Sequence, residues 1–477
     1  MKKILEWGVT AVIFLLPWQT VWIIQEQMIG PQGAIGVWQY GTLKVYAIEF
    51  LIVALAFLAV LHTLKKMVSS PNFAKNVTFQ NSDLTPFFFI AFLFFSGLSI
   101  TWSGDKLVAL FAWVRLLERA SLFFLIRSFP IRWALVFGAW IVAALAQSVL
   151  GVWQFAAQEV VANKFLGIAA HQPFTLGDAV VEAGDRRWLR AYGAFPHPNM
   201  LGAYLAVSLA VCAGTLSYLK EKWQWLIVIL ASQVLLIALL LTFSRSAWLA
   251  VGVAAVIGCF AAIHSRYRYT LKRSNGQRLG NLQPHVATAR ARAAITPTVM
   301  LVLISMITAT IFVFGFREEI QTRVGFSQSR LEVQSISERI GGIGRATPLL
   351  KEYLLFGTGI GNFTNTLFRF EESRGVVQPW YTYQPLHNVF LMIFAELGLL
   401  GIVLLLMIVV FAIRNIRSSS LRAVSYLPTG QASGLLIILF IFSLFDHFLW
   451  THPFGLFFAA ITLGVFAKTQ MWYNKMR

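Results

Sequence analysis

The chain has 477 residues, of which 57% are hydrophobic and only 12% are charged, and its mean hydropathy is +0.68. This composition excludes a soluble globular protein and predicts an all-α protein with several membrane-spanning helices. The formal net charge of +19 would favour nucleic-acid binding in a soluble chain. In a membrane protein the placement of the cationic side chains decides its meaning, so we predict contact with membrane lipids and no nucleic-acid partner.

Twelve apolar stretches predict membrane-spanning helices, which together make residues 1–477 one integral membrane domain. The stretches are 4–24, 45–64, 85–101, 107–126, 133–155, 199–219, 223–242, 247–263, 297–314, 387–413, 432–445 and 454–467. A helix needs roughly 20 apolar residues to cross a bilayer. The first stretch follows two lysines as in a signal peptide, but it lacks a small-residue cleavage site, so we predict a retained span. In the fourth, Arg115, Glu118 and Arg119 have spacings that predict pairing on one helix face, and together with Glu49 of the second stretch they predict a structural ion-pair network.

The lysines and arginines predict which connections face the cytoplasm. The segment 265–292 contains seven Lys or Arg and no acidic residue, which is typical of a cytoplasmic loop. Counting twelve crossings from a cytoplasmic N-terminus also puts Lys65-Lys66 and the C-terminus inside. The connections that the same count puts on the extracytoplasmic side include 156–198, 244–245, 317–386 and 446–447. The region 317–386 is therefore predicted to be a long extracytoplasmic loop between the ninth and tenth helices.

The cysteines and aspartates do not indicate a metal site. Cys212 and Cys259 fall within apolar stretches, so we expect neither a disulfide framework nor a cysteine-ligated metal. The five aspartates are scattered along the chain without a paired acidic motif, so we expect no divalent-cation site.

The polar region 317–386 ends at Pro385-Leu386-His387-Asn388, where the chain enters an apolar helix. A neutral imidazole can remove a proton from a hydroxyl group, so His387 is a candidate general base. A histidine at a helix entry, with Asn388 helping to cap the helix, explains the same residues without chemistry. The residues alone leave both interpretations open.

Four arginines, Arg187, Arg190, Arg245 and Arg339, lie on segments predicted to be outside, against the usual charge bias. A planar guanidinium binds phosphate oxygens through parallel hydrogen bonds and stays charged when partly buried. One explanation is therefore a pyrophosphate ligand at the membrane surface. The alternative is that each arginine extends to lipid headgroups or pairs with a neighbouring glutamate.

Three other outer motifs have mainly structural interpretations. The sequence GAFPHPN at 193–199 is typical of a rigid turn in which Asn199 caps the next helix, with a ligand role for His197 as the alternative. The glycine-rich run 357–363 does not follow a β-strand and is not followed by a Lys-Ser or Lys-Thr pair, which disfavours a nucleotide-binding loop. The pair at 446–447 predicts a tight interfacial hairpin, with lining of the same cavity as the alternative.

Four motifs occur in a fixed order along the chain. They are Gly193-x-Phe195-x-His197-Pro198-Asn199-x-x-Gly202; Thr242-Phe243-Ser244-Arg245-Ser246; Arg339 followed by Gly357-Thr358-Gly359-Ile360-Gly361-Asn362-Phe363; and His387-Asn388 with Glu396-x-Gly398-x-x-Gly401. With the twelve-helix layout, this order resembles the O-antigen ligase and O-antigen polymerase superfamily of membrane glycosyltransferases. One departure is the glycine-rich run 341–344, where family members usually have a helix-forming run with an aromatic residue. We therefore expect the helix carrying Arg339 to be frayed or displaced.

The resemblance implies a GT-C-like helical membrane fold that transfers a glycan from an undecaprenyl-diphosphate carrier. It implies inversion at the anomeric carbon, with no metal or other cofactor. The residues that it implies are His387 as general base, Arg245, Arg339 and Arg190 as ligands of the diphosphate, and His197, Asn199, Asn388 and Glu396 in supporting positions. The implied location is a bacterial inner membrane, with both termini cytoplasmic and the active site extracytoplasmic.

The acceptor stays open at this point. Ligation to lipid A-core in lipopolysaccharide biosynthesis, polymerisation of glycan repeat units, transfer to protein and attachment to a wall polymer all use the same donor chemistry. A lipid-linked glycan flippase is the alternative from a different class. It requires cationic side chains along a central cavity that both membrane faces can reach, rather than a cluster with a histidine on one side.

Overall fold

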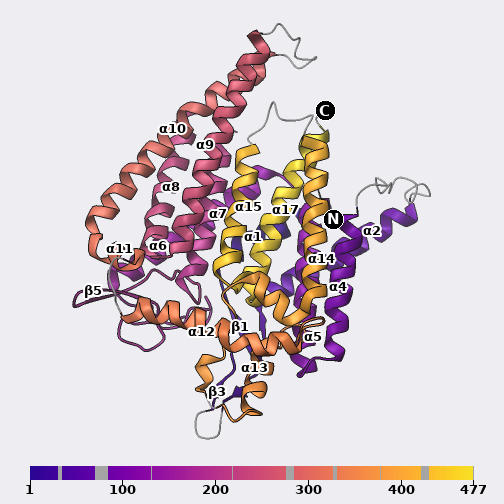
Figure 1. The fold of residues 1–477 in the computed structure, drawn as a ribbon. Coiled ribbons are helices and arrows are strands. Elements are labelled where there is room, and N and C mark those ends of the chain that lie inside the picture. Colours follow the sequence, from indigo (N-terminus) through magenta and orange to yellow (C-terminus); the bar gives the residue numbers. More distant parts are fainter. Residues whose placement is uncertain are drawn as a thin grey trace.

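In the computed structural model the chain forms a bundle of long helices with small β-hairpins at one end (Figure 1). The structure describes residues 1–30, 35–69, 84–129, 131–216, 219–274, 284–325, 330–376, 378–420 and 429–475. The long helices are α1 (Lys2–Leu15), α2 (Ala47–Ser69), α4 (Thr85–Leu98), α5 (Lys106–Ser128), α6 (Trp133–Ala157), α7 (Pro198–Leu216), α8 (Lys222–Leu241), α9 (Arg245–Ser274), α10 (Pro284–Gly315), α12 (Arg330–Glu352), α14 (Val389–Ser420), α15 (Thr429–Phe445) and α17 (Pro453–Lys475). The short elements are α11 (Arg317–Val324), α13 (Phe363–Glu372), α16 (Phe448–Thr451), η1 (Ser99–Thr101) and η2 (Trp380–Thr382).

Among the described residues the strands form three antiparallel two-stranded sheets rather than one core sheet. Their pairs are β1 (Val21–Gln25) with β4 (Leu43–Tyr46), β2 (Met28–Ile29) with β3 (Gly36–Val37), and β5 (Val180–Ala183) with β6 (Arg186–Leu189). The β5–β6 hairpin lies in the connection before α7, which carries the GAFPHPN turn.

Each of the twelve predicted apolar stretches contains a helix. Within the part of the chain that the structure describes, six helices are long and apolar enough to cross a membrane: Ala47–Ser69, Trp133–Ala157, Pro198–Leu216, Lys222–Leu241, Pro297–Gly315 and Val389–Arg414. Four shorter apolar helices cover Thr85–Thr101, Arg245–Phe260, Gly434–Phe445 and Pro453–Val465. The predicted membrane-helix class is thus confirmed, while the count of twelve crossings stays a prediction.

The first predicted span is wrong in its second half. Helix α1 ends at Leu15, one residue before the turn that contains Pro17, whose ring cannot continue a helix. The β-branched residues that follow pair as strand β1 with β4. At 1.5 Å per residue, the 14-residue helix is about 21 Å long, which is shorter than a bilayer core of roughly 30 Å.

The region 317–386 is folded rather than an irregular loop. It contains α11, α12, α13 and η2. Helix α12 runs without a break through the glycine-rich run 341–344, so the expected fraying of the helix that carries Arg339 is wrong. The apolar residues at 333, 336, 340 and 343 recur at helical spacing and supply the pattern that continues across the glycines.

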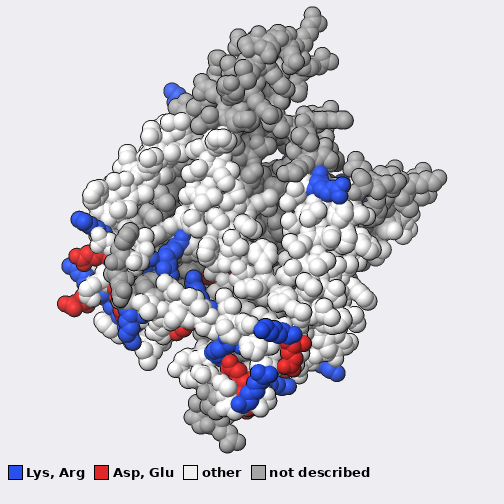
Figure 2. Space-filling view, in the orientation of Figure 1, with Lys and Arg blue, Asp and Glu red and all other residues white. Residues whose placement is uncertain are grey.

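The outer connections 156–198, 244–245, 317–386 and 446–447 meet at one end of the bundle, drawn at the bottom of Figure 1. The Arg323 Nη2 donates to the Phe243 carbonyl at 2.9 Å, and the Asn199 Nδ2 donates to Asp446 Oδ2 at 3.0 Å. Figure 2 shows that charged side chains gather at this end, while the middle of the visible face is almost free of charge. The predicted cytoplasmic segment 265–292 lies partly outside the described residues, since 275–283 are among those not described.

A break in α14 connects this end to the glycine-rich run. Gly398 has φ 64° and ψ −165°, a conformation essentially restricted to glycine. The chain at 354–359 crosses the break and satisfies the backbone groups that it frees: Leu399 N donates to the Leu354 carbonyl at 2.9 Å, and Gly359 N donates to the Glu396 carbonyl at 2.8 Å. The run 357–363 is therefore a packing motif against α14. The two cysteines are both free thiols, with Cys212 buried and Cys259 exposed.

A candidate active site at one end of the bundle

His387 lies immediately before α14, and its neighbour Asn388 performs the capping. The Asn388 Oδ1 accepts a hydrogen bond from Leu391 N at 3.0 Å, and its Nδ2 donates to the Leu444 carbonyl at the end of α15, also at 3.0 Å. The predicted cap by Asn388 is thus confirmed. Because Asn388 fills this role, the His387 imidazole is not needed to start the helix.

The His387 imidazole faces the turn between α15 and α16. His387, Asp446 and His447 each offer one atom that lies within 4.8 Å of the others, and the two imidazole centroids are 5.1 Å apart. The His387 Nδ1 is buried and has no hydrogen-bond partner among the described residues. The turn at 446–447 therefore contributes directly to the surroundings of the candidate base.

Asp446 is linked to the other outer motifs through Asn199. Asp446 Oδ2 accepts from Asn199 Nδ2, and Asn199 Oδ1 accepts from Arg190 Nη2 at 2.8 Å. Arg190 is 5% exposed, and its Nε donates to the Thr242 carbonyl at 2.5 Å. The prediction that the Asn199 side chain caps α7 is wrong, because that side chain is held between Arg190 and Asp446. Instead the His197 Nδ1 accepts from Asn199 N at 3.1 Å, so the imidazole takes the capping position.

We call His197, His387, Asp446 and His447 the imidazole–carboxylate cluster. Burial lowers the pKa of His387 below its ordinary value, and Asp446 partly offsets this shift. Burial also lowers the pKa of His447 to about 4 and that of His197 to about 3. For Asp446, burial alone would raise the pKa, but the imidazoles and the Asn199 hydrogen bond lower it below the ordinary value. At neutral pH the cluster therefore contains three neutral imidazoles and one carboxylate.

Arg339 and Arg190 lie close to different histidines of the cluster. Arg339 comes from α12, is half-buried, and lies close enough for its charge to lower the pKa of both His387 and His447. Arg190 lowers the pKa of His197 in the same way. Arg245 begins α9, three residues after Thr242, and its Nη1 donates to the Arg323 carbonyl at 3.4 Å. Arg187, the fourth outer arginine, instead pairs with Glu182 within the β5–β6 hairpin, at 3.4 Å.

Glu396 lies deeper in the bundle than the cluster. It is 4% exposed, and its Oε2 accepts from Trp450 Nε1 at 2.8 Å. This hydrogen bond joins α14 to α16, so Glu396 has a structural role in holding the two helices together. Glu396 also lines a separate pocket.

His387, Asp446 and His447 are also able to act as ligands of a metal ion. The expectation of no metal stays a prediction. In the present arrangement Asp446 Oδ1 accepts from His447 N at 2.8 Å, and His447 Nδ1 shares a hydrogen bond with Thr451 Oγ1 at 2.7 Å. A metal would thus use Nε2 of His447.

The sequence identified His387, Arg190 and Arg339, but it did not assign Asp446 a part in the chemistry. The available signal was an acidic residue next to a histidine on a turn predicted to lie on the same side as His387. Only the tertiary structure shows that Asp446 belongs to the site, since Asn199, its hydrogen-bond partner, is 247 residues away in the chain.

The fold and the site define a polytopic helical membrane protein with an imidazole–carboxylate cluster flanked by arginines at one end of its bundle. Residues 230–406 match the family model of the O-antigen ligases, a segment that includes Arg245, Arg339, His387 and Glu396. This match confirms the resemblance to the O-antigen ligase and polymerase superfamily. A comparison with curated proteins gave no match.

Proposed function

We propose that the protein is a glycosyltransferase of ligase or polymerase type, which transfers a glycan from undecaprenyl diphosphate to an acceptor hydroxyl on the outer face of a bacterial inner membrane. The observation that carries the proposal is the convergence of His387 and Asp446, with Arg190 linked to Asp446 through Asn199 and Arg339 close to His387. The family match to O-antigen ligases supports the same class of reaction.

In the proposed reaction, His387 removes the proton of the acceptor hydroxyl while the oxygen attacks the anomeric carbon. A new carbon–oxygen bond forms with inversion, and the bond to the diphosphate oxygen breaks, so that its electron pair leaves with undecaprenyl diphosphate. Asp446 stabilises the positive charge that develops on His387. Arg339, Arg245 and Arg190 offset the negative charge that develops on the leaving diphosphate. In this proposal the side chains of Asp446 and the three arginines provide all of the charge stabilisation, and no metal ion takes part.

The test is transfer in proteoliposomes that contain a radiolabelled lipid-linked glycan and an acceptor glycan. The wild-type protein is expected to release the lipid diphosphate and form a new glycosidic bond. His387→Ala is expected to bind donor but to lose turnover by about 10²- to 10⁴-fold, the usual contribution of a general base. A matched control is His171→Ala, because His171 is also paired with an aspartate but lies in the connection before β5.

Wild-type turnover by folded His387→Ala would remove His387 from the mechanism. Movement of the labelled lipid between leaflets without a new glycosidic bond would instead support the flippase alternative. The purified protein is judged folded by its thermal unfolding in detergent, so loss of activity is separated from loss of structure.

A further inference from the structure

A polar pocket lies beside the imidazole–carboxylate cluster. It has a volume of about 70 Å³ and lies between α5, α14, the chain before β4 and the residues around α16. Thr451 lines the pocket and shares a hydrogen bond with His447 Nδ1, while Tyr40 lines it and meets the His447 ring edge-on at 5.9 Å. The pocket therefore shares a wall with the cluster.

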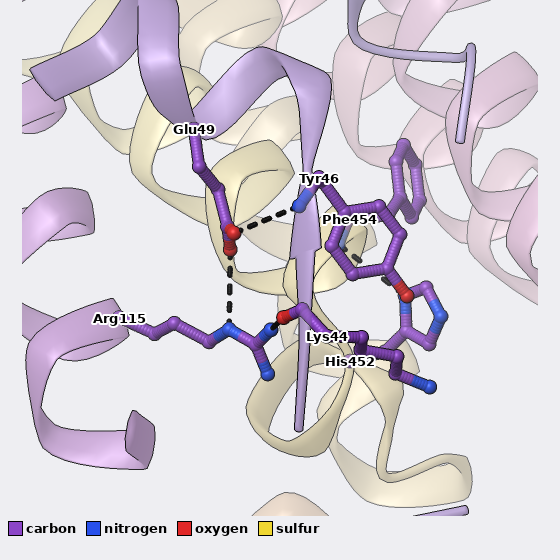
Figure 3. Close-up of polar contacts among 6 residues, drawn as sticks. All are labelled: Lys44, Tyr46, Glu49, Arg115, His452 and Phe454. Atoms are coloured by element: carbon purple, nitrogen blue, oxygen red, sulfur yellow. Dashed lines mark hydrogen bonds and ion pairs between the residues drawn. The ribbon is translucent and has the colours of Figure 1, made fainter. Parts of the chain in front are cut away.

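Two arginines of α5, Arg115 and Arg119, line this pocket. The predicted ion-pair network of Glu49, Arg115, Glu118 and Arg119 is confirmed for one pair, because Arg115 Nε pairs with Glu49 of α2 at 3.1 Å. Its Nη2 donates to the Lys44 carbonyl, and Figure 3 shows Arg115 held between Glu49 and Lys44. Burial, followed by the charge of Arg115, lowers the pKa of Lys44 to about 8, so its amine stays mostly protonated at neutral pH.

Arg119 has no comparable partner. It is 6% exposed, and its Nε is buried without a hydrogen-bond acceptor among the described residues. Its guanidinium lies 5.3 Å from the centroid of the Phe457 ring, a contact that leaves the Nε–H unsatisfied. A buried cationic donor without an acceptor is unfavourable, so this position favours a bound anion.

The pocket has room for such a group. Its volume of about 70 Å³ is several times the roughly 10–15 Å³ that one water molecule requires. Glu396 is the acidic residue that lines it, and its Oε2 already accepts from Trp450 Nε1. Among the residues that line the pocket, Arg115 and Arg119 outnumber Glu396, which leaves the pocket attractive to an anion. The carboxylates of Glu49 and Glu118 act on these arginines from outside the lining.

We propose that this pocket binds an acidic group of a sugar, a carboxylate or a phosphate ester, and so selects acidic glycans as substrates. The inference rests on the proposed function for its biological meaning. Because Thr451 and Tyr40 join the pocket to His447, an acidic group held by Arg119 places the rest of its sugar beside the cluster. The specificity for an acidic sugar would thus be set next to the reacting hydroxyl.

The experiment measures binding to the purified full-length protein in detergent by calorimetry at constant ionic strength. The probes are glucuronate, glucose 6-phosphate, glucose and inorganic phosphate. We expect glucuronate or glucose 6-phosphate to bind at least about tenfold more tightly than glucose, the effect of one charge-assisted hydrogen bond. The first two probes distinguish a carboxylate from a phosphate ester.

Arg119→Met is expected to abolish this preference, while Arg119→Lys keeps the charge and retains part of it. Arg186→Met removes an exposed arginine of β6 and is the matched control, expected to bind as the wild type does. If Arg119→Met does not fold, the preference of the wild-type protein and of Arg119→Lys still tests the proposal. Equal binding of glucose, or an unchanged preference in folded Arg119→Met, overturns it.

Inorganic phosphate that binds as tightly as the acidic sugars also overturns the proposal, because the pocket would then hold a free anion. The binding measurement needs no glycan transfer. Arg119-dependent binding without any transfer would therefore leave the pocket standing and refute the proposed function. Glycan transfer without a preference for acidic sugars would support the proposed function and refute the role of the pocket.

Discussion

Replacing Asp446 by asparagine tests the arrangement of the site most directly. The substitution keeps the size of the side chain and one oxygen that can accept from His447 N, but it removes the negative charge beside His387. In the proposed mechanism this charge stabilises the imidazolium that forms as the acceptor hydroxyl loses its proton. Asp446 is 6% exposed, so solvent does not screen the interaction strongly.

The size of the effect follows from the geometry. A ring nitrogen of His387 lies within 4.8 Å of an Asp446 oxygen. Unit charges at that separation attract by about 3.5 kcal/mol at an effective dielectric constant of about 20. If the proton is about half transferred in the transition state, roughly 1.7 kcal/mol is lost and turnover falls about 20-fold. With complete transfer the loss approaches about 300-fold.

The pH dependence gives a second signature. The base form of His387 exists above its pKa, which burial lowers and Asp446 partly restores. Removing Asp446 therefore lowers this pKa further, so the acidic limb of kcat/KM moves to lower pH while the plateau falls. If the substitution only damaged the structure of the site, the plateau of kcat/KM would fall while its acidic limb stayed at the same pH.

The assay is glycan transfer in proteoliposomes between pH 4.5 and 8.5, with thermal unfolding as a check on structure. The control is Asp178→Asn, which breaks the other histidine–aspartate pair, 2.6 Å between His171 Nδ1 and Asp178 Oδ1. It is expected to leave both the plateau and the acidic limb in place. Folded Asp446→Asn with turnover within twofold of wild type, and an unmoved limb, would refute the role assigned to Asp446.

Other predictions concern stability and metals. Gly398→Ala should destabilise the fold by about 1–3 kcal/mol or more, because φ 64° strains any other residue. The new Cβ would also lie 2.3 Å from the Leu355 oxygen. An unchanged melting temperature would contradict this prediction. Asn362→Ala should cost about 1–3 kcal/mol, because Asn362 bonds both the N–H and the carbonyl of Asp105 at 2.8 and 3.0 Å; chemical unfolding measures it, with exposed Ser373→Ala as the control. Chelators should leave glycan transfer unchanged, and elemental analysis should find no stoichiometric metal. Loss of transfer that added zinc or manganese restores would show that the imidazole–carboxylate cluster holds an ion.

The class of protein and much of the layout were predictable from the sequence. Apolar stretches of membrane length predict helices because the backbone must satisfy its own hydrogen bonds in lipid. The placement of Lys and Arg grouped 156–198, 244–245, 317–386 and 446–447 on one side, and these segments do meet at one end of the bundle. His387 could be singled out because it is an ionisable residue at the point where a polar region enters a helix.

The two local errors come from sequence signals that do not determine structure by themselves, hydropathy in one case and helix propensity in the other. The apolar run 4–24 contains both a helix and a strand, because hydropathy alone does not distinguish a spanning helix from a strand that pairs with β4. The glycines at 341–344 lower helix propensity by about 1 kcal/mol each, yet helix α12 continues through them, so a propensity argument alone placed the fraying wrongly.

The partners of the site residues were decided only by the tertiary structure. Asn199 is a residue type that often caps helices, yet its side chain forms hydrogen bonds with Arg190 and Asp446 because the turn before α7 is packed against the end of α15. Arg119 has the spacing of an ion pair, yet its Nε remains without an acceptor in the described structure. Hydrogen bonds between residues hundreds of positions apart leave no local periodicity in the sequence. The sequence therefore determined which chemical groups reach this end of the bundle, and the packing of the helices decided which of them meet.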